Sequence, residues 1–177
     1  MMSRNLEYKA EAVDIGNLER EFVANGAVFK MSMHQVDTYF NVSRGRLKIR
    51  TIEGGGAELI FYEREEKSPD SMISLYHLAP IPEKGIIDIL GLALNVKVRV
   101  EKVRRLLMLE NARIHLDEVK NLGNFLEIEV VHEGNDHDDR ILLQYLKRIA
   151  AKYIVRELNK SYSDLLLEGR ESISAGR

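Results

Sequence analysis

Hydrophobic and polar residues alternate along much of the chain, and alternation with a period of two predicts β-strands. In residues 4–12, for example, Glu7 and Lys9 share one parity, and Leu6 and Tyr8 share the other. Seven further segments are predicted to be strands: 32–40, 44–53, 57–65, 72–79, 96–109, 112–119 and 125–132.

Three segments predict helices. Asp14 can cap a helix that ends near Gly26, and a short helix is expected after Pro82. Residues 138–159 are strongly amphipathic, with apolar positions that follow an i, i+4, i+8 stripe: Ile141, Leu142, Tyr145, Leu146, Ile149, Tyr153 and Ile154. Eight strands and three helices in 177 residues predict one antiparallel α+β domain over residues 1–177, with its core at about 4–167.

Several predicted strands place their charged residues on one face. The residues that share a parity are Glu7 with Lys9; Arg44, Arg46, Lys48 and Arg50; Lys102 with Arg104; Arg113, His115 and Asp117; and Glu127 with Glu129. One interpretation is the solvated outer face of an open antiparallel sheet. The other is a barrel, because eight strands can close one, with the helices covering its apolar outside and the charges lining its interior.

We expect the second arrangement, a closed eight-stranded antiparallel β-barrel with helices packed outside. Charges inside a protein are costly unless they are paired, bind a metal, or face water and ligand. Lys and Arg side chains hold phosphate groups, and carboxylates hold a hard divalent cation such as Mg²⁺. The interior therefore predicts a binding site for a polyanion and a cation.

Composition narrows the classes of function. Lysine and arginine total 26 and aspartate and glutamate total 28, so the net charge of −2 argues against a nucleic-acid or anionic-membrane partner. The absence of cysteine excludes disulfides, thiolate nucleophiles and zinc–sulfur sites. The longest apolar stretch, residues 86–96, is shorter than the roughly 18 residues that suggest a membrane span, and the start lacks the pattern of a signal peptide. We expect a cytoplasmic protein.

Eight short motifs occur in order along the chain: residues 5–10 (NLEYKA), 35–40 (QVDTYF), 45–50 (GRLKIR), 61–64 (FYER), 100–104 (VEKVR), 113–119 (RIHLDEV), 122–129 (LGNFLEIE) and 161–166 (SYSDLL). The first resembles the Glu-x-Glu-x-Lys signature of the CYTH superfamily, the triphosphate tunnel metalloenzymes. The ordered set resembles that superfamily from about residue 4 to 167, and most closely its class IV adenylate cyclase-like branch. Thiamine triphosphatases and inorganic triphosphatases belong to the same superfamily.

The resemblance implies roles for the charged residues. Mg²⁺ or Mn²⁺ would be held by Glu7, Glu127 and Glu129, and Asp117 would either join them or hold basic neighbours in place. The triphosphate would be bound by Lys9, Lys48, Arg50, Lys102, Arg104 and Arg113. Among these, Lys9, Lys102 and Arg104 would be catalytic. His115 shares their parity, either with a role of its own or as a polar part of the wall.

The sequence departs from the family pattern at two places that concern this site. Asn5 stands where the signature has its first glutamate, which removes one metal ligand and leaves one or two metals as alternatives. Glu63-Arg64-Glu65 stands where the family often has a lysine, so either Glu63 adds a carboxylate to the tunnel or Arg64 replaces the missing base.

The resemblance implies an enzyme that acts on a triphosphate, first as an adenylate cyclase that converts ATP to cyclic AMP and pyrophosphate. The alternatives are an inorganic or thiamine triphosphatase and a non-catalytic nucleotide- or polyphosphate-binding module. An RNA-binding barrel that uses residues 44–50 is disfavoured, because that strand has no aromatic residues on which bases could stack. A homodimer is one possible assembly.

Overall fold

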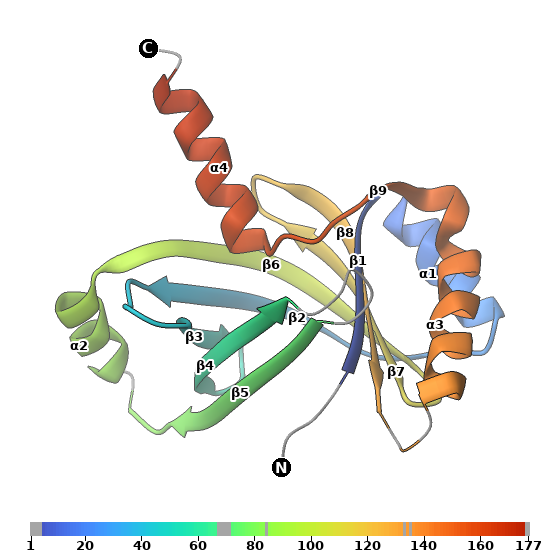
Figure 1. The fold of residues 1–177 in the computed structure, drawn as a ribbon, viewed down its shortest axis with the longest axis horizontal. Helices are drawn as coiled ribbons and strands as arrows, with labels where there is room; N and C mark the ends of the chain where they lie inside the picture. Colours follow the sequence, from blue (N-terminus) through green and yellow to red (C-terminus); the bar gives the residue numbers. More distant parts are fainter. Residues whose placement is uncertain (1–4, 67–71, 84, 133, 135, 176–177) are drawn as a thin grey trace.

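The computed structural model describes residues 5–66, 72–83, 85–132, 134 and 136–175 (Figure 1). Its elements are β1 (Asn5–Ala12), α1 (Ile15–Ala24), β2 (Val28–Phe40), β3 (Arg46–Ile52), β4 (Ala57–Glu66), β5 (Met72–Ile81), α2 (Gly85–Leu94), β6 (Val96–Leu109), β7 (Ala112–Val119), β8 (Gly123–Val131), α3 (Asp136–Ala150), the 3₁₀ turn η1 (Ala151–Tyr153), β9 (Ile154–Glu157) and α4 (Tyr162–Ala175). No helix in this part of the chain is long and apolar enough to cross a membrane.

The described strands form one antiparallel nine-stranded sheet in the order β5-β4-β3-β2-β6-β7-β8-β1-β9. The sheet curves until β1 and β5 approach within 8 Å between Cα atoms, yet the described residues show no ladder between them. The predicted closed eight-stranded barrel is therefore not confirmed. One physical reason is that β9 pairs with the outer edge of β1 at residues 10–12, and the Leu158 amide donates to the Lys9 carbonyl at 2.8 Å.

Helices α1 and α3 pack side by side on the outside of the curved sheet (Figure 1). Phe22 of α1 and Leu146 of α3 are completely buried against Ala10, Ile114 and Ile128 of the strands. These strand residues have the parity opposite to the charged positions, so the prediction that helices cover the apolar face is confirmed for α1 and α3. Helix α2 has no buried residue and does not cover that face. Burial of this apolar face is the main favourable contribution to the stability of the domain.

The helix predicted at 138–159 is wrong beyond Ala150. The chain there turns through η1 into β9, because the β-branched Ile154 and Val155 lie beside the free edge of β1. Of the predicted apolar stripe, Leu142, Leu146 and Tyr153 are buried. Ile141 is 51 % exposed and Tyr145 is 36 % exposed, so these two do not face the core. Strand β2 begins at Val28 rather than at residue 32.

Helix α4 was not predicted as a helix. Its start is marked by a reciprocal pair of hydrogen bonds, in which the Asp164 amide donates to Ser161 Oγ at 3.2 Å and the Ser161 amide donates to Asp164 Oδ2 at 3.1 Å. Its first turn packs against Tyr39, Val98 and Phe125, on the sheet face opposite to α1 and α3. We call this second face the concave face, and α4 covers one end of it.

Candidate functional site

Charged residues from six strands meet on the concave face, and the strand register explains why. Lys9 lies directly opposite Glu127, and His115 lies opposite Glu127 from the other side. Glu7 and Arg113 flank Glu129 in the same way. Residues that are directly opposite in an antiparallel pair project to the same face. The sequence-predicted residues brought together here are Glu7, Lys9, Lys48, Arg50, Lys102, Arg104, Arg113, Asp117, Glu127 and Glu129.

Asp117 organises one half of this face. It is fully buried and accepts two hydrogen bonds from Arg104, at 2.7 and 2.6 Å, while Lys102 Nζ lies 3.6 Å from its Oδ2. Burial would raise the pKa of Asp117, but the charges of Arg104 and Lys102 outweigh it and lower that pKa to about 2. Of the two roles expected for Asp117, the contacts favour the one that holds basic neighbours in place.

Glu127 is engaged in the same network. Arg104 Nη2 donates to Glu127 Oε2 at 2.7 Å, and Lys9 Nζ lies 3.4 Å from Oε1. Burial raises the pKa of this carboxyl, and Lys9 and Arg104 nevertheless hold it well below its usual range. For Lys102, burial and the charge of Arg104 lower the pKa to about 7. The basic side chains are thus fixed in position by carboxylates before any ligand binds.

Asp37 organises the other half, and the sequence analysis did not assign it a role. It accepts from Lys48 Nζ at 2.7 Å and from Arg50 Nε and Nη2 at 2.9 and 3.0 Å, and Gln35 donates to it at 3.1 Å. Burial raises the pKa of Asp37, yet Lys48 and Arg50 lower it well below its ordinary value. Its position in the 35–40 motif was a usable signal, because β2 pairs with β3 so that Asp37 faces Arg50.

Tyr162, in the first turn of α4, was also missed. Its hydroxyl donates to Asp117 Oδ2 at 2.9 Å, and its ring centroid lies 4.4 Å from Lys9 Nζ and 5.1 Å from Lys102 Nζ. Such contacts between a cation and an aromatic face are attractive. Residue Tyr162 lies in no predicted strand, so alternation could not reveal it, whereas the Ser161-x-x-Asp164 capping pattern could have shown a helix start.

The remaining predicted metal ligands are Glu7 and Glu129. Burial and the neighbouring Glu127 raise the pKa of Glu129, and Arg113 Nη1 lies 3.6 Å from its Oε2. Beside it, His115 Nδ1 is buried without a hydrogen-bond partner among the described residues. Burial and the charge of Arg104 lower the pKa of His115 to about 3, so its imidazole is neutral. An orphaned nitrogen beside acidic side chains fits a site for a divalent cation.

The predicted ligands are not fully assembled around one point. Within the described ranges, the one group of three acidic or histidine side chains whose donor atoms all lie within 4.8 Å of one another is His132, Asp136 and Asp139. It lies at the start of α3, away from the concave face. His132 Nδ1 is 2.8 Å from Asp139 Oδ2, and Asn111 Nδ2 donates to Asp139 Oδ1 at 2.9 Å. These contacts explain the group as the hydrogen-bonded, acidic beginning of a helix.

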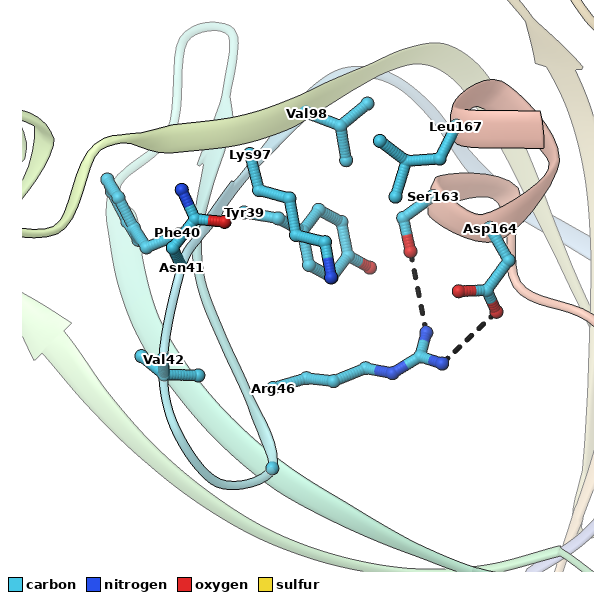
Figure 2. Close-up of a pocket in the computed structure, with 11 residues that line it drawn as sticks. Tyr39, Phe40, Asn41, Val42, Arg46, Lys97, Val98, Ser163, Asp164 and Leu167 are labelled. Carbon is cyan, nitrogen blue, oxygen red and sulfur yellow. Dashed lines mark hydrogen bonds and ion pairs between the residues drawn. The ribbon is translucent and has the colours of Figure 1, made fainter. Parts of the chain in front are cut away.

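A pocket of about 140 Å³ adjoins the concave face where α4 meets the turn between β2 and β3. Figure 2 shows the Arg46 guanidinium bridging Ser163 and Asp164 at its wall, with Tyr39 and Lys97 also facing the space. Arg46 Nη1 also donates to Ser161 Oγ at 2.7 Å. Tyr39 links the pocket to the charged face, because its side chain lines the pocket and its hydroxyl lies 3.5 Å from Lys48 Nζ.

The side chain of Glu63 pairs with Arg44 rather than with the basic cluster of Lys48 and Arg50. Glu63 accepts from the exposed Arg44, with Nη2 to Oε2 at 2.9 Å. The side chain of Arg64 lies outside the described residues, so the alternative that it replaces a missing base stays a prediction.

Comparison with known proteins agrees with this architecture. PH1012 from Pyrococcus horikoshii OT3 is 25 % identical, with 93 % of this chain and 99 % of that chain covered and a TM-score of 0.74. PH1819 from the same organism is 24 % identical, with 93 % of this chain and 99 % of that chain covered and a TM-score of 0.72. A proposed adenylate cyclase from Vibrio parahaemolyticus is 14 % identical, with 94 % of this chain and 99 % of that chain covered and a TM-score of 0.67. At this identity the likeness shows the fold alone. None of the curated proteins compared with the chain matches it.

The sequence model of the CYTH domain matches residues 3–162, which is nearly the whole chain. This match confirms the resemblance carried by the eight ordered motifs, and the register of the strands brings the charged residues of those motifs onto one face. The chain therefore belongs to the CYTH domain family.

Proposed function

We propose that this protein is a metal-dependent enzyme that acts on the triphosphate of ATP and forms cyclic AMP and pyrophosphate. The observation that carries the proposal is the set of five basic side chains held on the concave face of a CYTH domain: Lys9, Lys48, Arg50, Lys102 and Arg104. Buried carboxylates already fix their positions. A triphosphate can take over these hydrogen bonds without reorganising the side chains, which favours charge stabilisation in a transition state.

The basic residues divide into two groups in this proposal. Lys48 and Arg50, held by Asp37, bind the outer phosphates. Lys9, Lys102 and Arg104, held by Asp117 and Glu127, stabilise the charge that develops where the phosphoryl bond breaks, while Arg113 binds at the rim. Glu7, Glu127 and Glu129 are the candidate ligands of Mg²⁺ or Mn²⁺, which when bound screens the charge of the triphosphate. No covalent protein nucleophile is needed.

The pocket beside Tyr39 favours a nucleotide over bare inorganic triphosphate. It adjoins Lys48, so a triphosphate on the concave face could place an attached nucleoside there. Tyr39 and Phe40 offer aromatic surface, and Asn41 and Lys97 offer polar groups. A bulky attached group would be accommodated by this space, whereas inorganic triphosphate would leave it unused.

The test is a product assay on ATP, inorganic triphosphate and thiamine triphosphate, each with Mg²⁺ and with Mn²⁺. Cyclic AMP and pyrophosphate from ATP support the proposal. Orthophosphate from any of the three identifies a triphosphatase instead, and binding without turnover identifies a non-catalytic module. Lys97→Ala should raise KM for ATP, whereas Lys120→Ala, on a surface pair with Glu101, should leave it unchanged.

The remaining partners stay predictions. Lys48 and Arg50 are turned inward to Asp37, which argues further against an extended RNA surface on β3. A cytoplasmic location and a homodimer rest on the sequence alone.

A further inference from the structure

His115 is a buried histidine on the concave face with an unsatisfied ring nitrogen. Its side chain is 8 % exposed, and its Nδ1 has no hydrogen-bond partner in the described part of the chain. Buried polar atoms are almost always hydrogen-bonded, so an orphaned one calls for an explanation. Glu129 Oε1 lies 3.8 Å from this nitrogen, which is too far for a hydrogen bond.

The same distance suits two ligands of one cation. Metal–nitrogen and metal–oxygen bonds to histidine and carboxylate are about 2.1 Å, so two ligands of one ion lie about 3.0 Å apart at a right angle and about 4.2 Å apart when opposite. The separation of 3.8 Å falls between these limits. A cation between the two atoms would satisfy the nitrogen and neutralise Glu129.

The neighbours of His115 strengthen this interpretation. Glu127 lies directly opposite it on β8, and Glu129 Oε1 lies 3.8 Å from its Nδ1. Glu7 lies opposite Glu129 on β1, so a third carboxylate is on the same face.

We propose that His115 Nδ1 and Glu129 are the principal protein ligands of the divalent cation, with Glu7 and Glu127 completing its surroundings, and that the imidazole makes the site prefer Mn²⁺ to Mg²⁺. The proposal rests on the metal dependence in the proposed function. Imidazole binds transition metals well, whereas Mg²⁺ is bound mainly by oxygen atoms. Asp117 is not a ligand in this arrangement, because Arg104 and Tyr162 occupy its oxygens.

The experiment uses tag-free protein loaded with Mn²⁺ alone and observed by pulsed electron paramagnetic resonance. The wild type should show the ¹⁴N coupling of a directly bound imidazole. His115→Gln should abolish that coupling and weaken Mn²⁺ binding about tenfold or more, while Mg²⁺ binding changes less. His132→Gln is the matched control, because His132 belongs to the other acidic group, and it should leave both readouts unchanged.

Three outcomes overturn the assignment: no ¹⁴N coupling in the wild type, coupling that survives in His115→Gln, or coupling that disappears in His132→Gln. If His115→Gln fails to fold by circular dichroism, wild type and His132→Gln grown with ¹⁵N-histidine decide the question. Conversion of the ¹⁴N signal to a ¹⁵N signal in both proteins supports the assignment to the concave face, and its loss in His132→Gln refutes it.

Failure of this inference and failure of the proposed function give different results. The resonance experiment contains no triphosphate, so a bound imidazole without turnover of any triphosphate leaves the metal site standing and removes the function. Conversely, if His115→Gln turns over substrate with the wild-type ratio of activity in Mn²⁺ to activity in Mg²⁺, the proposed function is retained and the assignment of His115 as a metal ligand is rejected.

Discussion

Replacing Asp37 with asparagine removes the carboxylate that holds Lys48 and Arg50. Asp37 accepts four hydrogen bonds, from Lys48, twice from Arg50, and from Gln35. Asparagine keeps one acceptor oxygen, and its NH₂ group replaces the second oxygen, which accepts hydrogen bonds in the wild type. Two cations therefore lose their counter-charge, and one of them, Lys48, is almost completely buried.

The magnitude follows from the burial of the partners. Removing one member of a buried ion pair costs about 3–5 kcal/mol, because the other charge is left uncompensated. The Arg50 side chain is 24 % exposed and water can solvate part of it, so we expect the lower end, about 3 kcal/mol. For a domain of this length each kcal/mol lowers the melting temperature by about 2–4 °C, so Asp37→Asn should melt about 6–12 °C below the wild type at pH 7.

The assay is thermal unfolding followed by circular dichroism, with and without tripolyphosphate. Oxygen atoms of the bound anion would replace those of Asp37, so tripolyphosphate should raise the melting temperature of Asp37→Asn more than that of the wild type. Glu11→Gln is the control, since it breaks an exposed pair with Arg156 and should change the melting temperature by less than about 2 °C. A loss of less than about 2 °C for Asp37→Asn would refute the assigned role of this carboxylate.

Three further predictions concern stability. The melting-temperature difference between wild type and Asp37→Asn should narrow as pH falls below about 3.8, because Asp37 has a lowered pKa and its contribution is lost on protonation; a constant difference down to pH 2 would contradict this. Leu146→Ala should cost about 2–5 kcal/mol by denaturant unfolding, against less than about 1 kcal/mol for the half-exposed Ile141→Ala, and equal losses would place α3 wrongly. Gly45→Ala should lower the melting temperature more than Gly54→Ala. Both glycines have positive φ, but only at Gly45 would an added Cβ meet a ring carbon of Phe61, at 2.6 Å. A larger loss of melting temperature for Gly54→Ala than for Gly45→Ala would exclude that clash.

Local pattern determined much of this molecule. Alternation placed eight strands and assigned Lys9, Lys48, Lys102 and Arg104 to the face opposite α1 and α3, because side chains of a strand alternate whatever the strand pairs with. The ordered motifs also led to the family. These features depend on periods of a few residues, which the sequence carries directly.

Tertiary structure decided how the edges and side chains meet. The β-branched Ile154 and Val155 favour a strand, but nothing local shows that residues 154–157 pair with β1, since that choice depends on an edge left free by distant parts of the chain. The partners of Asp37 and Tyr162 and the orphaned nitrogen of His115 likewise arise only when strands and α4 come together. Parity determines which face a charge occupies, but the distances that turn charges into a site come from contacts between segments far apart in the chain.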